Sequence, residues 1–305
     1  MLLATGCAVA NQRVHLNPDV PQERRVGDLT FRGGLALDDA SDGFGGLSAI
    51  RVSPDGARLL ALSDRGRWFE MSLAYDPGGD LAAADVAASG RLSHPDGRAL
   101  RRRESDAEAL AELANGSIVV AFELEHRLWR YPRTEPPFGQ PPTMLEAPQG
   151  IDRAHRNMGM EALTELADGR LLVIAEGLRL ADDTGAAWIG DGERWSAVGY
   201  GLTPGFEPTG AALLPDGDVI VTERRASLLG GFATRLVRLS RADLDAEARL
   251  DGQEIARLEP PLTVDNVEAV AARRDGSGKI LIYLVSDDNF TRLQRTLLMM
   301  FELSP

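Results

Sequence analysis

Short apolar segments alternate with Asp-Gly and Asn-Gly turns along most of the chain. An apolar segment, such a turn and a second apolar segment together predict two antiparallel strands joined by a tight hairpin. In five of these units the turn glycine stands eight positions after a leading residue. The five units read SAIRVSPDG, EALAELANG, EALTELADG, TGAALLPDG and EAVAARRDG. One spacing repeated five times indicates five hairpins of one design.

The hairpin units recur at the length of a propeller blade. Their leading residues lie 48 to 60 positions apart, and a third β-rich segment follows most units. Repeats of that length, each forming one small antiparallel sheet, are typical of β-propellers. We therefore predict an all-β fold, a single β-propeller with five blades by motif count; a further HPDG turn in the long first repeat leaves six blades open. A β-sandwich is the rival fold, which the regular repeat disfavours.

The last unit is one strand short of a complete blade. It has three apolar segments, ending in RTLLMMFEL, whereas a propeller blade has four strands. The N-terminal segment GDLTFRGGLALD, residues 27–38, has the length and apolar content to supply the fourth strand. Pairing of this segment with the last blade closes the ring and leaves no open sheet edge.

Acidic residues end the strand that follows each turn. Because the two strands of a hairpin are antiparallel, the end of the second strand returns to the beginning of the first. The acids of both positions are therefore expected to converge on one mouth of the central channel. The leading column comprises Ser48, Glu108, Glu161, Thr209 and Glu268, and the second column comprises Asp64, Glu123, Glu176, Glu223 and Asp287.

Carboxylates crowded at one mouth repel each other and need protons, arginines or a cation to compensate their charge. One interpretation is that Glu-Arg pairs lock adjacent blades together. The other is a Ca²⁺ site, since Ca²⁺ takes about six to eight oxygen ligands. The metal interpretation assigns as ligands Asp64, Glu108, Glu161, Glu176, Glu223, Glu268 and Asp287, with Asn157, Asn266 and Asn289 as neutral additions.

Two arginines directly follow acids of the second column, Arg65 in SDRG and Arg224 in TERR. A guanidinium group donates to two oxygens at once, so both arginines are expected to orient the phosphate or carboxylate oxygens of a substrate. Glu161 or Glu268 is expected to act as the catalytic base, and the sequence ranks neither above the other.

Composition excludes several other classes of function. The net charge is −13 and Lys279 is the only lysine, so the chain has no broad basic surface for nucleic acid. The sequence has no G-x-S-x-G nucleophile motif, and its four histidines lack the spacing of zinc ligands. One cysteine allows no disulfide within the chain. We expect a small anionic ester as the partner of a monomeric protein.

The segment LLATGCAVANQ around Cys7 resembles the end of a bacterial lipoprotein signal, in which the cysteine becomes the lipidated N-terminus. We therefore assign residues 1–22 to a truncated leader and flexible N-terminus, and residues 23–305 to the propeller. An incidental cysteine in a leader is the alternative. The lipoprotein interpretation predicts a periplasmic or outer-membrane-anchored protein, with membrane contact only through a lipid on Cys7.

Several segments together resemble one family. They are GGLSAI with LALSDRG, DAEALA with VVAFE, NMGMEALTELADGRLLVIAEG, VIVTERR, and VDNVEAV with SDDNFTRLQRTLL. These motifs resemble the phytase-like family of bacterial secreted propellers, also described as "esterase-like activity of phytase", over about residues 26–303. The resemblance is most specific at SDRG and SDDNFTRLQ. It implies a propeller, export from the cytoplasm and hydrolysis of phosphate or carboxylate esters.

The columns and the resemblance lead to one functional hypothesis and two alternatives. The hypothesis is an exported hydrolase that acts on a small anionic ester at an acidic, Ca²⁺-binding propeller mouth. The first alternative is a propeller without catalytic activity that binds a ligand or a protein at the same face. The second is a lactonase-like Ca²⁺ propeller. The sequence does not decide whether the protein is an enzyme.

Overall fold

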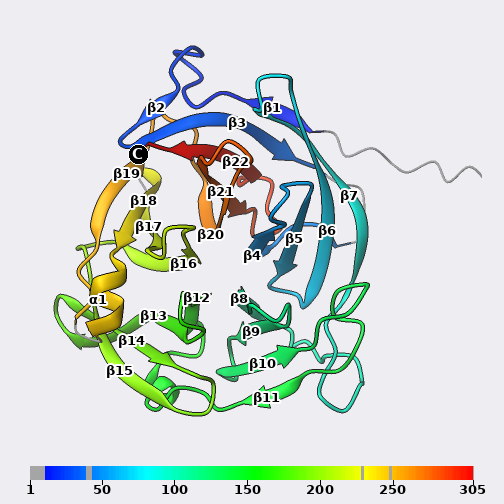
Figure 1. The fold of residues 1–305 in the computed structure, drawn as a ribbon, viewed down its shortest axis with the longest axis vertical. Coiled ribbons are helices and arrows are strands. Elements are labelled where there is room, and N and C mark those ends of the chain that lie inside the picture. Colours follow the sequence, from blue (N-terminus) through cyan, green and yellow to red (C-terminus); the bar gives the residue numbers. More distant parts are fainter. Residues whose placement is uncertain (1–10, 39–42, 228–229, 247–248, 305) are drawn as a thin grey trace, which may run out of the picture.

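The computed structural model describes residues 11–38, 43–227, 230–246 and 249–304. Within these ranges the chain forms five antiparallel sheets around a central axis, as Figure 1 shows. The predicted five-bladed β-propeller is therefore confirmed, and the described residues form no sixth blade. Cys7, on which the prediction of a lipid anchor depends, lies outside the described ranges.

Four consecutive strands build each of the first four blades. The first blade contains β4 (Leu47–Val52), β5 (Arg58–Ser63), β6 (Arg67–Tyr75) and β7 (Leu81–Arg91). The second contains β8 (Ala107–Glu112), β9 (Ile118–Phe122), β10 (Arg127–Tyr131) and β11 (Thr143–Leu145). The third contains β12 (Met160–Glu165), β13 (Leu171–Ala181), β14 (Thr184–Gly190) and β15 (Trp195–Gly201). The fourth contains β16 (Glu207–Leu213), β17 (Val219–Ser227), β18 (Gly231–Leu239) and β19 (Gln253–Leu258).

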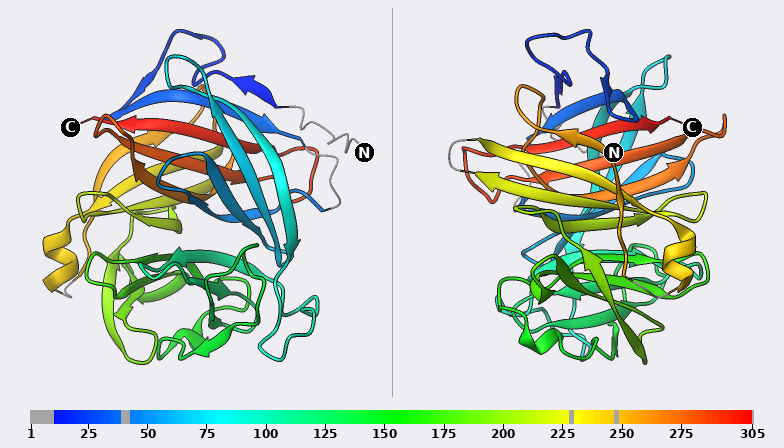
Figure 2. Two further views of the ribbon diagram at one scale, coloured as in Figure 1. Left: turned by 45° about the vertical axis from the view of Figure 1, so that its right-hand side comes forward. Right: turned by 90° about the vertical axis from the view of Figure 1, so that its left-hand side faces the viewer.

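The fifth blade joins both ends of the described chain. It is built from β20 (Asn266–Arg274), β21 (Ile280–Asp287), β22 (Thr296–Leu303) and the N-terminal β3 (Leu29–Leu37). The pairing of β3 with β22 runs from Thr296 opposite Leu37 to Leu303 opposite Leu29, and Figure 2 shows the two strands side by side, β3 in blue and β22 in red. The predicted closing strand is thus confirmed.

Residues assigned to the leader also pack on the fifth blade. The strand β1 (Gln12–Val14) pairs with β3, and β2 (Arg25–Val26) pairs with it as well. Leu16 is fully buried, and its carbonyl accepts a hydrogen bond from the Thr263 backbone N–H at 2.7 Å. The packed part of the chain therefore begins before residue 23.

The hydrophobic core lies between the blades. Five clusters of buried apolar side chains occur, and each joins two neighbouring blades. Leu35, Phe69 and Tyr283, for example, bring the fifth blade against the first. Because each fully buried large side chain contributes about 1.5–3 kcal/mol, these interfaces hold the ring together and fix the inner strands around the axis.

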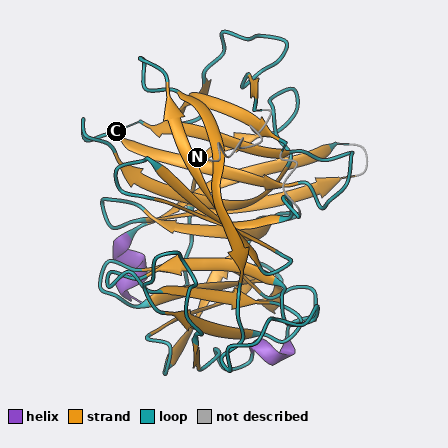
Figure 3. Ribbon diagram, turned by 90° about the vertical axis from the view of Figure 1, so that its right-hand side faces the viewer, coloured by secondary structure: helices purple, strands orange, loops and turns teal. Residues whose placement is uncertain are grey.

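Helical structure is confined to the periphery of the described chain, as Figure 3 shows. It consists of α1 (Arg241–Ala246) and the 3-10 turn η1 (Ile151–Arg153). Neither these nor any other helix among the described residues has the length and apolar content to cross a membrane.

Candidate functional site

The inner strands β4, β8, β12, β16 and β20 line the channel, and each contains a β-bulge at the same place. In each strand, pairing with the next strand of the blade skips one residue near the beginning. A bulge of this kind re-aims the side chain of the extra residue. The residues that the pairing skips are the whole leading column: Ser48, Glu108, Glu161, Thr209 and Glu268.

The three glutamates of that column face a cavity of about 360 Å³ at one end of the channel. Eight carboxylates of the described chain line this cavity, and we call them the acidic mouth: Asp64, Asp106, Glu108, Glu123, Glu161, Glu176, Glu268 and Asp287. Among the described lining residues, Arg224 is the one cation. Deeper in the channel, residues such as Ala109 and Ala269 leave a space of only about 10 Å³. The acidic mouth is therefore a cavity closed at its inner end, and no open pore continues from it.

Six of the seven predicted metal ligands line the mouth, and Glu223 does not. Its side chain is buried at 1 % exposure, where it accepts hydrogen bonds from the Tyr200 hydroxyl at 2.7 Å and from Nη1 of Arg235 at 2.5 Å. The pairing of β17 with β18 has no register shift, and it places Glu223 directly opposite Arg235. In β13, by contrast, pairing with β14 shifts after Ile174, next to Glu176. The prediction of Glu223 as a ligand at the mouth is therefore not supported by its position.

Arg224 takes the place in the mouth that Glu223 was expected to occupy, because neighbouring residues of a strand point to opposite faces. Its Nη1 donates to Oδ1 of Asn266 at 2.6 Å and to Oε1 of Glu268, and its Nη2 lies 3.4 Å from Oε1 of Glu176. One guanidinium group from the fourth blade thus connects acids of the third and fifth blades.

The other residues predicted for the site are divided between the mouth and its surroundings. Asn266 and Asn289 line the mouth, whereas Asn157 is exposed and does not. Arg65 lies outside the cavity, with its guanidinium carbon 3.2 Å from the centre of the Phe290 ring. Asp106 lines the mouth but was not expected there. It stands two positions before Glu108, as Asn266 stands two positions before Glu268, and this period of two was the available signal.

Burial and mutual repulsion hold protons on the acidic mouth. Burial, with Asp106 and Asp288 nearby, raises the pKa of Asp64 to about 6. It raises the pKa of Asp287 to about 7 and that of Glu268 to about 8, the latter in spite of Arg224. The pKa of Glu108 is also raised far above its ordinary value, by burial and by its acidic neighbours. At neutral pH several carboxyl groups of the mouth are therefore protonated and uncharged.

Glu161 and Glu123 are neighbouring carboxyl groups that influence each other's pKa. Burial and the neighbouring acids raise the pKa of Glu123 to about 9, whereas the pKa of Glu161 rises only to about 7, because backbone and side-chain donors partly stabilise its charge. One of these donors is the Gly159 N–H, 3.2 Å from Oε1 of Glu161. A Cβ at residue 159 would lie 2.7 Å from Nδ1 of His126, so only glycine fits this approach. Glu161 is thus held in place and poised to change its protonation near neutral pH.

The two hydroxyl residues of the leading column have a structural role. Ser48 donates to the carbonyl of Ala107, and Thr209 donates to the carbonyl of Val267 at 3.1 Å. Both acceptors belong to the next blade, one residue before its own leading residue. At the bulge, a hydroxyl therefore binds the adjacent blade, and a carboxyl faces the cavity.

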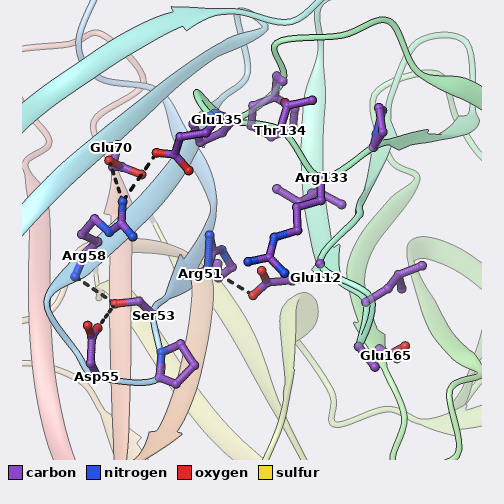
Figure 4. A pocket seen from close by; sticks show the side chains of 18 residues that line it. Arg51, Ser53, Asp55, Arg58, Glu70, Glu112, Arg133, Thr134, Glu135 and Glu165 are labelled. Atoms are coloured by element: carbon purple, nitrogen blue, oxygen red, sulfur yellow. Dashed lines mark hydrogen bonds and ion pairs between the residues drawn. The ribbon is translucent and has the colours of Figure 1, made fainter.

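A larger cavity, about 630 Å³, lies between the first and second blades at the end of the strands where the Asp-Gly and Asn-Gly turns are. Figure 4 shows its lining side chains. Arg58 lies 3.6 Å from Glu70 and 3.7 Å from Glu135, and Arg51 lies 3.2 Å from Glu112. Arginines and acids pair with each other here, so little charge is left for a ligand, and the acidic mouth is the stronger candidate site.

Comparisons with solved structures find matches at low identity. Hydrazine synthase of Kuenenia stuttgartiensis is 13% identical with a TM-score of 0.42, over 84% of this chain and 60% of that one. Virginiamycin B lyase from Staphylococcus aureus is 11% identical with a TM-score of 0.47, over 97% of this chain and 99% of that one. A sequence comparison with curated proteins finds no match.

The profile of one family matches most of the propeller. It is described as Phytase-like, "esterase-like activity of phytase", and the match runs over residues 42–290. This range contains the inner strands of all five blades and every carboxylate of the acidic mouth. The match includes the motif SDRG and the first five residues of SDDNFTRLQ, and the chain belongs to the Phytase-like family.

Proposed function

We propose that the protein is a hydrolase of small anionic esters and that the acidic mouth, with a bound Ca²⁺ ion, is its active site. The observation that carries the proposal is the gathering of eight carboxylates around one arginine in a single cavity. Buried acids with strongly raised pKa values are costly to keep, and such groups concentrate at functional sites. The family match supports ester hydrolysis as the class of reaction.

The residues of the mouth fit a hard cation. Asp106, Glu108 and Glu123 each offer a carboxylate oxygen, and these oxygens lie within 4.8 Å of one another. Asn266 and Asn289 add amide oxygens to the same cavity. A donor set made only of oxygens suits Ca²⁺ rather than zinc. These residues would hold the ion, which would supply positive charge to attract and polarise an anionic ester.

Glu161 is the better of the two predicted bases. Glu268 accepts hydrogen bonds from both Arg224 and Asn266 at one oxygen, Oε1, so this oxygen is already engaged. Glu161 accepts from one backbone N–H and has a pKa of about 7. In the proposed reaction Glu161 takes a proton from water, the water oxygen bonds to the phosphorus or acyl carbon, and the ester bond breaks. The leaving oxygen takes a proton from solvent, and Glu161 releases its own.

Arg224 has the position to bind the substrate as well as the protein. Its guanidinium group lies in the cavity wall between Glu176 and Glu268. A guanidinium has five N–H donors, which leaves donors for a phosphate or carboxylate oxygen. We assign Arg224 to orientation of the anionic group beside Glu161.

The competing explanation of the acids is that Glu-Arg pairs lock adjacent blades together. The contacts of Arg224 support this explanation for part of the mouth. This arginine accounts for Glu176 and Glu268. No other carboxylate of the acidic mouth forms an ion pair with an arginine of the described chain within 4.0 Å. Locking therefore explains two acids and leaves six, which a cation would compensate.

Thermal unfolding with Ca²⁺ and with EDTA tests the proposed site. A ligand that binds only the folded state stabilises it by RT ln(1 + [L]/Kd), or about 2.7 kcal/mol at a hundredfold excess over Kd. We expect the melting temperature to rise with Ca²⁺, and Glu108→Gln to abolish the rise. Glu165→Gln is the matched control, since Glu165 lies at the other end of the third blade's inner strand, β12. If the melting temperature of the unaltered protein is the same with Ca²⁺ and with EDTA, the proposed metal site is wrong.

A further inference from the structure

A second cavity, about 450 Å³, lies beside the acidic mouth and has the opposite charge. We call it the arginine pocket, and its lining consists of Arg65, Gly66, Arg91, Leu92, Leu100, Arg102 and Ser105. Among these described residues there are three arginines and no acid. The chain has a net charge of −13, so a cavity whose charged lining residues are all cations stands out against the rest of the molecule.

In the described part of the chain, the three guanidinium groups of the pocket have no acidic partner. Within the described chain, none of Arg65, Arg91 and Arg102 makes a side-chain hydrogen bond or an ion pair with an acid. Other arginines of this protein pair closely with acids, as Arg238 does with Asp216 and Asp218 at 2.7 and 2.6 Å. Five N–H donors on each guanidinium therefore remain for a ligand.

The walls of the pocket are fixed by the protein itself. The backbone N–H of Leu92 donates to the carbonyl of Gly66 at 2.9 Å. Gly66 has a φ of +63°, and a Cβ there would lie 2.9 Å from Cβ of Ser105. Glu104 binds both Nη atoms of Arg98, at 2.6 and 2.8 Å, and this pairing lowers the pKa of Glu104 to about 2. The loop that carries Arg102 is therefore held beside the end of the first blade.

Residues adjacent in the chain line the arginine pocket and the acidic mouth. Arg65 directly follows Asp64, and Ser105 directly precedes Asp106, so each of two wall segments faces both cavities. The ring of Phe290, which lies against the guanidinium of Arg65, follows Asn289 of the mouth. One ligand can therefore reach both cavities at once.

We propose that the arginine pocket is an oxyanion-binding subsite that takes a phosphate group. Each guanidinium can donate to two oxygens, and a tetrahedral dianion offers enough oxygens for several such donors, whereas a carboxylate offers two. Because the pocket adjoins the mouth, the substrate of the proposed hydrolase carries a second anionic group apart from the ester that reacts. This last step rests on the proposed function; the binding of phosphate by the three arginines does not.

Calorimetric titration with inorganic phosphate, in EDTA and at constant ionic strength, tests the subsite without any metal. We expect saturable binding to the unaltered protein and binding about tenfold or more weaker for Arg91→Gln and for Arg102→Gln, since each removes charge-assisted hydrogen bonds. Acetate is expected to bind more weakly than phosphate. Arg103→Gln is the matched control, with the same change of charge in the same loop outside the pocket lining.

The results divide clearly. Equal binding by the Arg91→Gln, Arg102→Gln and Arg103→Gln proteins, or no saturable binding to the unaltered protein, would overturn the subsite. Unchanged thermal unfolding of the variants in the absence of phosphate shows that they fold, as expected for exposed arginines. If phosphate binds as expected but no ester is hydrolysed, the subsite stands and the proposed function fails.

Discussion

The two ends of the inner strands carry the same kind of residue in different surroundings. In β8, Glu108 faces the acidic mouth, and Glu112 lies at the turn end of the same strand. Glu112 is partly exposed and lies 3.2 Å from Arg51. Glu108 instead has acidic neighbours, which together with burial raise its pKa far above the ordinary value. In β12 the same contrast separates Glu161 from Glu165.

This contrast shows that acids at the two ends of one strand differ in their electrostatic surroundings and therefore in their effect on stability. At the turn end, each exposed ion pair stabilises the fold by at most about 1 kcal/mol, so the loss of one pair changes the free energy of unfolding little. At the mouth, buried acids without arginines lower the stability of the fold. Proteins retain such groups where they serve function. Four measurements test whether the two ends differ in this way.

The largest effect on stability is expected from Arg224→Gln. Removal of this guanidinium leaves Glu176 and Glu268 without their cation, and the loss of one partner from a buried pair costs about 3 kcal/mol or more. Chemical denaturation at pH 8 is the measurement, and part of the loss is expected to disappear at pH 5, where the acids take up protons. Arg51→Gln at the turn end is the control. Equal losses for the two variants would contradict the comparison.

Next in size is the loss of activity expected from Glu161→Gln. A general base contributes about 10²–10⁴-fold to the rate, so hydrolysis of an anionic ester such as p-nitrophenyl phosphate should fall about 100-fold or more. Steady-state kinetics measure this, with Glu165→Gln expected to change kcat/KM less than about twofold. A Glu161→Gln protein with full activity would remove Glu161 from the proposed reaction.

The pH dependence of stability separates the two ends without any substrate. Acids whose folded pKa is raised bind more protons in the folded than in the unfolded state, so the stability they provide is present at low pH and lost as pH rises. The stability that protonated Asp287 provides is lost as pH rises from the ordinary pKa range of an aspartate to about 7. For Glu268 the corresponding loss extends up to about pH 8. In EDTA the free energy of unfolding should therefore fall from pH 5 to pH 8.

Asp287→Asn should flatten that fall by roughly 1–2 kcal/mol, since each unit of pKa difference corresponds to about 1.4 kcal/mol. The turn-end control is Asp55→Asn. A hydrogen bond from Ser53 lowers the pKa of Asp55, so its contribution is lost only as pH falls below its ordinary range. The Asp55→Asn substitution should therefore leave the change of the free energy of unfolding between pH 5 and pH 8 as it is in the unaltered protein. A fall of the same steepness in both variants would show that Asp287 does not contribute.

The smallest effect is expected for the pair Arg51 and Glu112. Both side chains are partly exposed, at 24% and 34%, and a double-mutant cycle with Arg51→Gln and Glu112→Gln should give a coupling below about 1 kcal/mol. Urea denaturation of the four proteins measures it. A coupling above about 2 kcal/mol would mean that the turn end also stores substantial electrostatic energy.

The sequence predicted those parts of the fold that local chemistry determines. Turn glycines such as Gly56 and Gly116, which have positive φ, mark four of the five hairpins, and the apolar segments around them form the inner strands. In the fifth hairpin the glycine with positive φ is Gly278 and not Gly276. The fourth strands have no such signal. β11 is only three residues long and follows a proline-rich segment, so its pairing with β10 depends on the finished blade and not on its own sequence.

The site was predicted in outline because the spacing located the carboxylates along the strands. It could not determine which way each side chain points. Glu223 occupies the same column as Glu176, but a regular ladder between β17 and β18 turns it toward Arg235. Asp106 was missed because it lies in the loop before β8 and belongs to neither column of acids, although it stands two positions before Glu108.

The closure of the ring by β3 sets an order for synthesis and folding. During synthesis β3 leaves the ribosome first among the strands of the fifth blade, and its partner β22 leaves it last, since Leu37 pairs with Thr296. Pairings between such distant segments form slowly. Until they form, the facing edges of β3 and β22 stay open to other chains. The β3–β22 seam is therefore the last part of the ring that can close, and the acidic mouth takes its final shape only after the whole chain has been made.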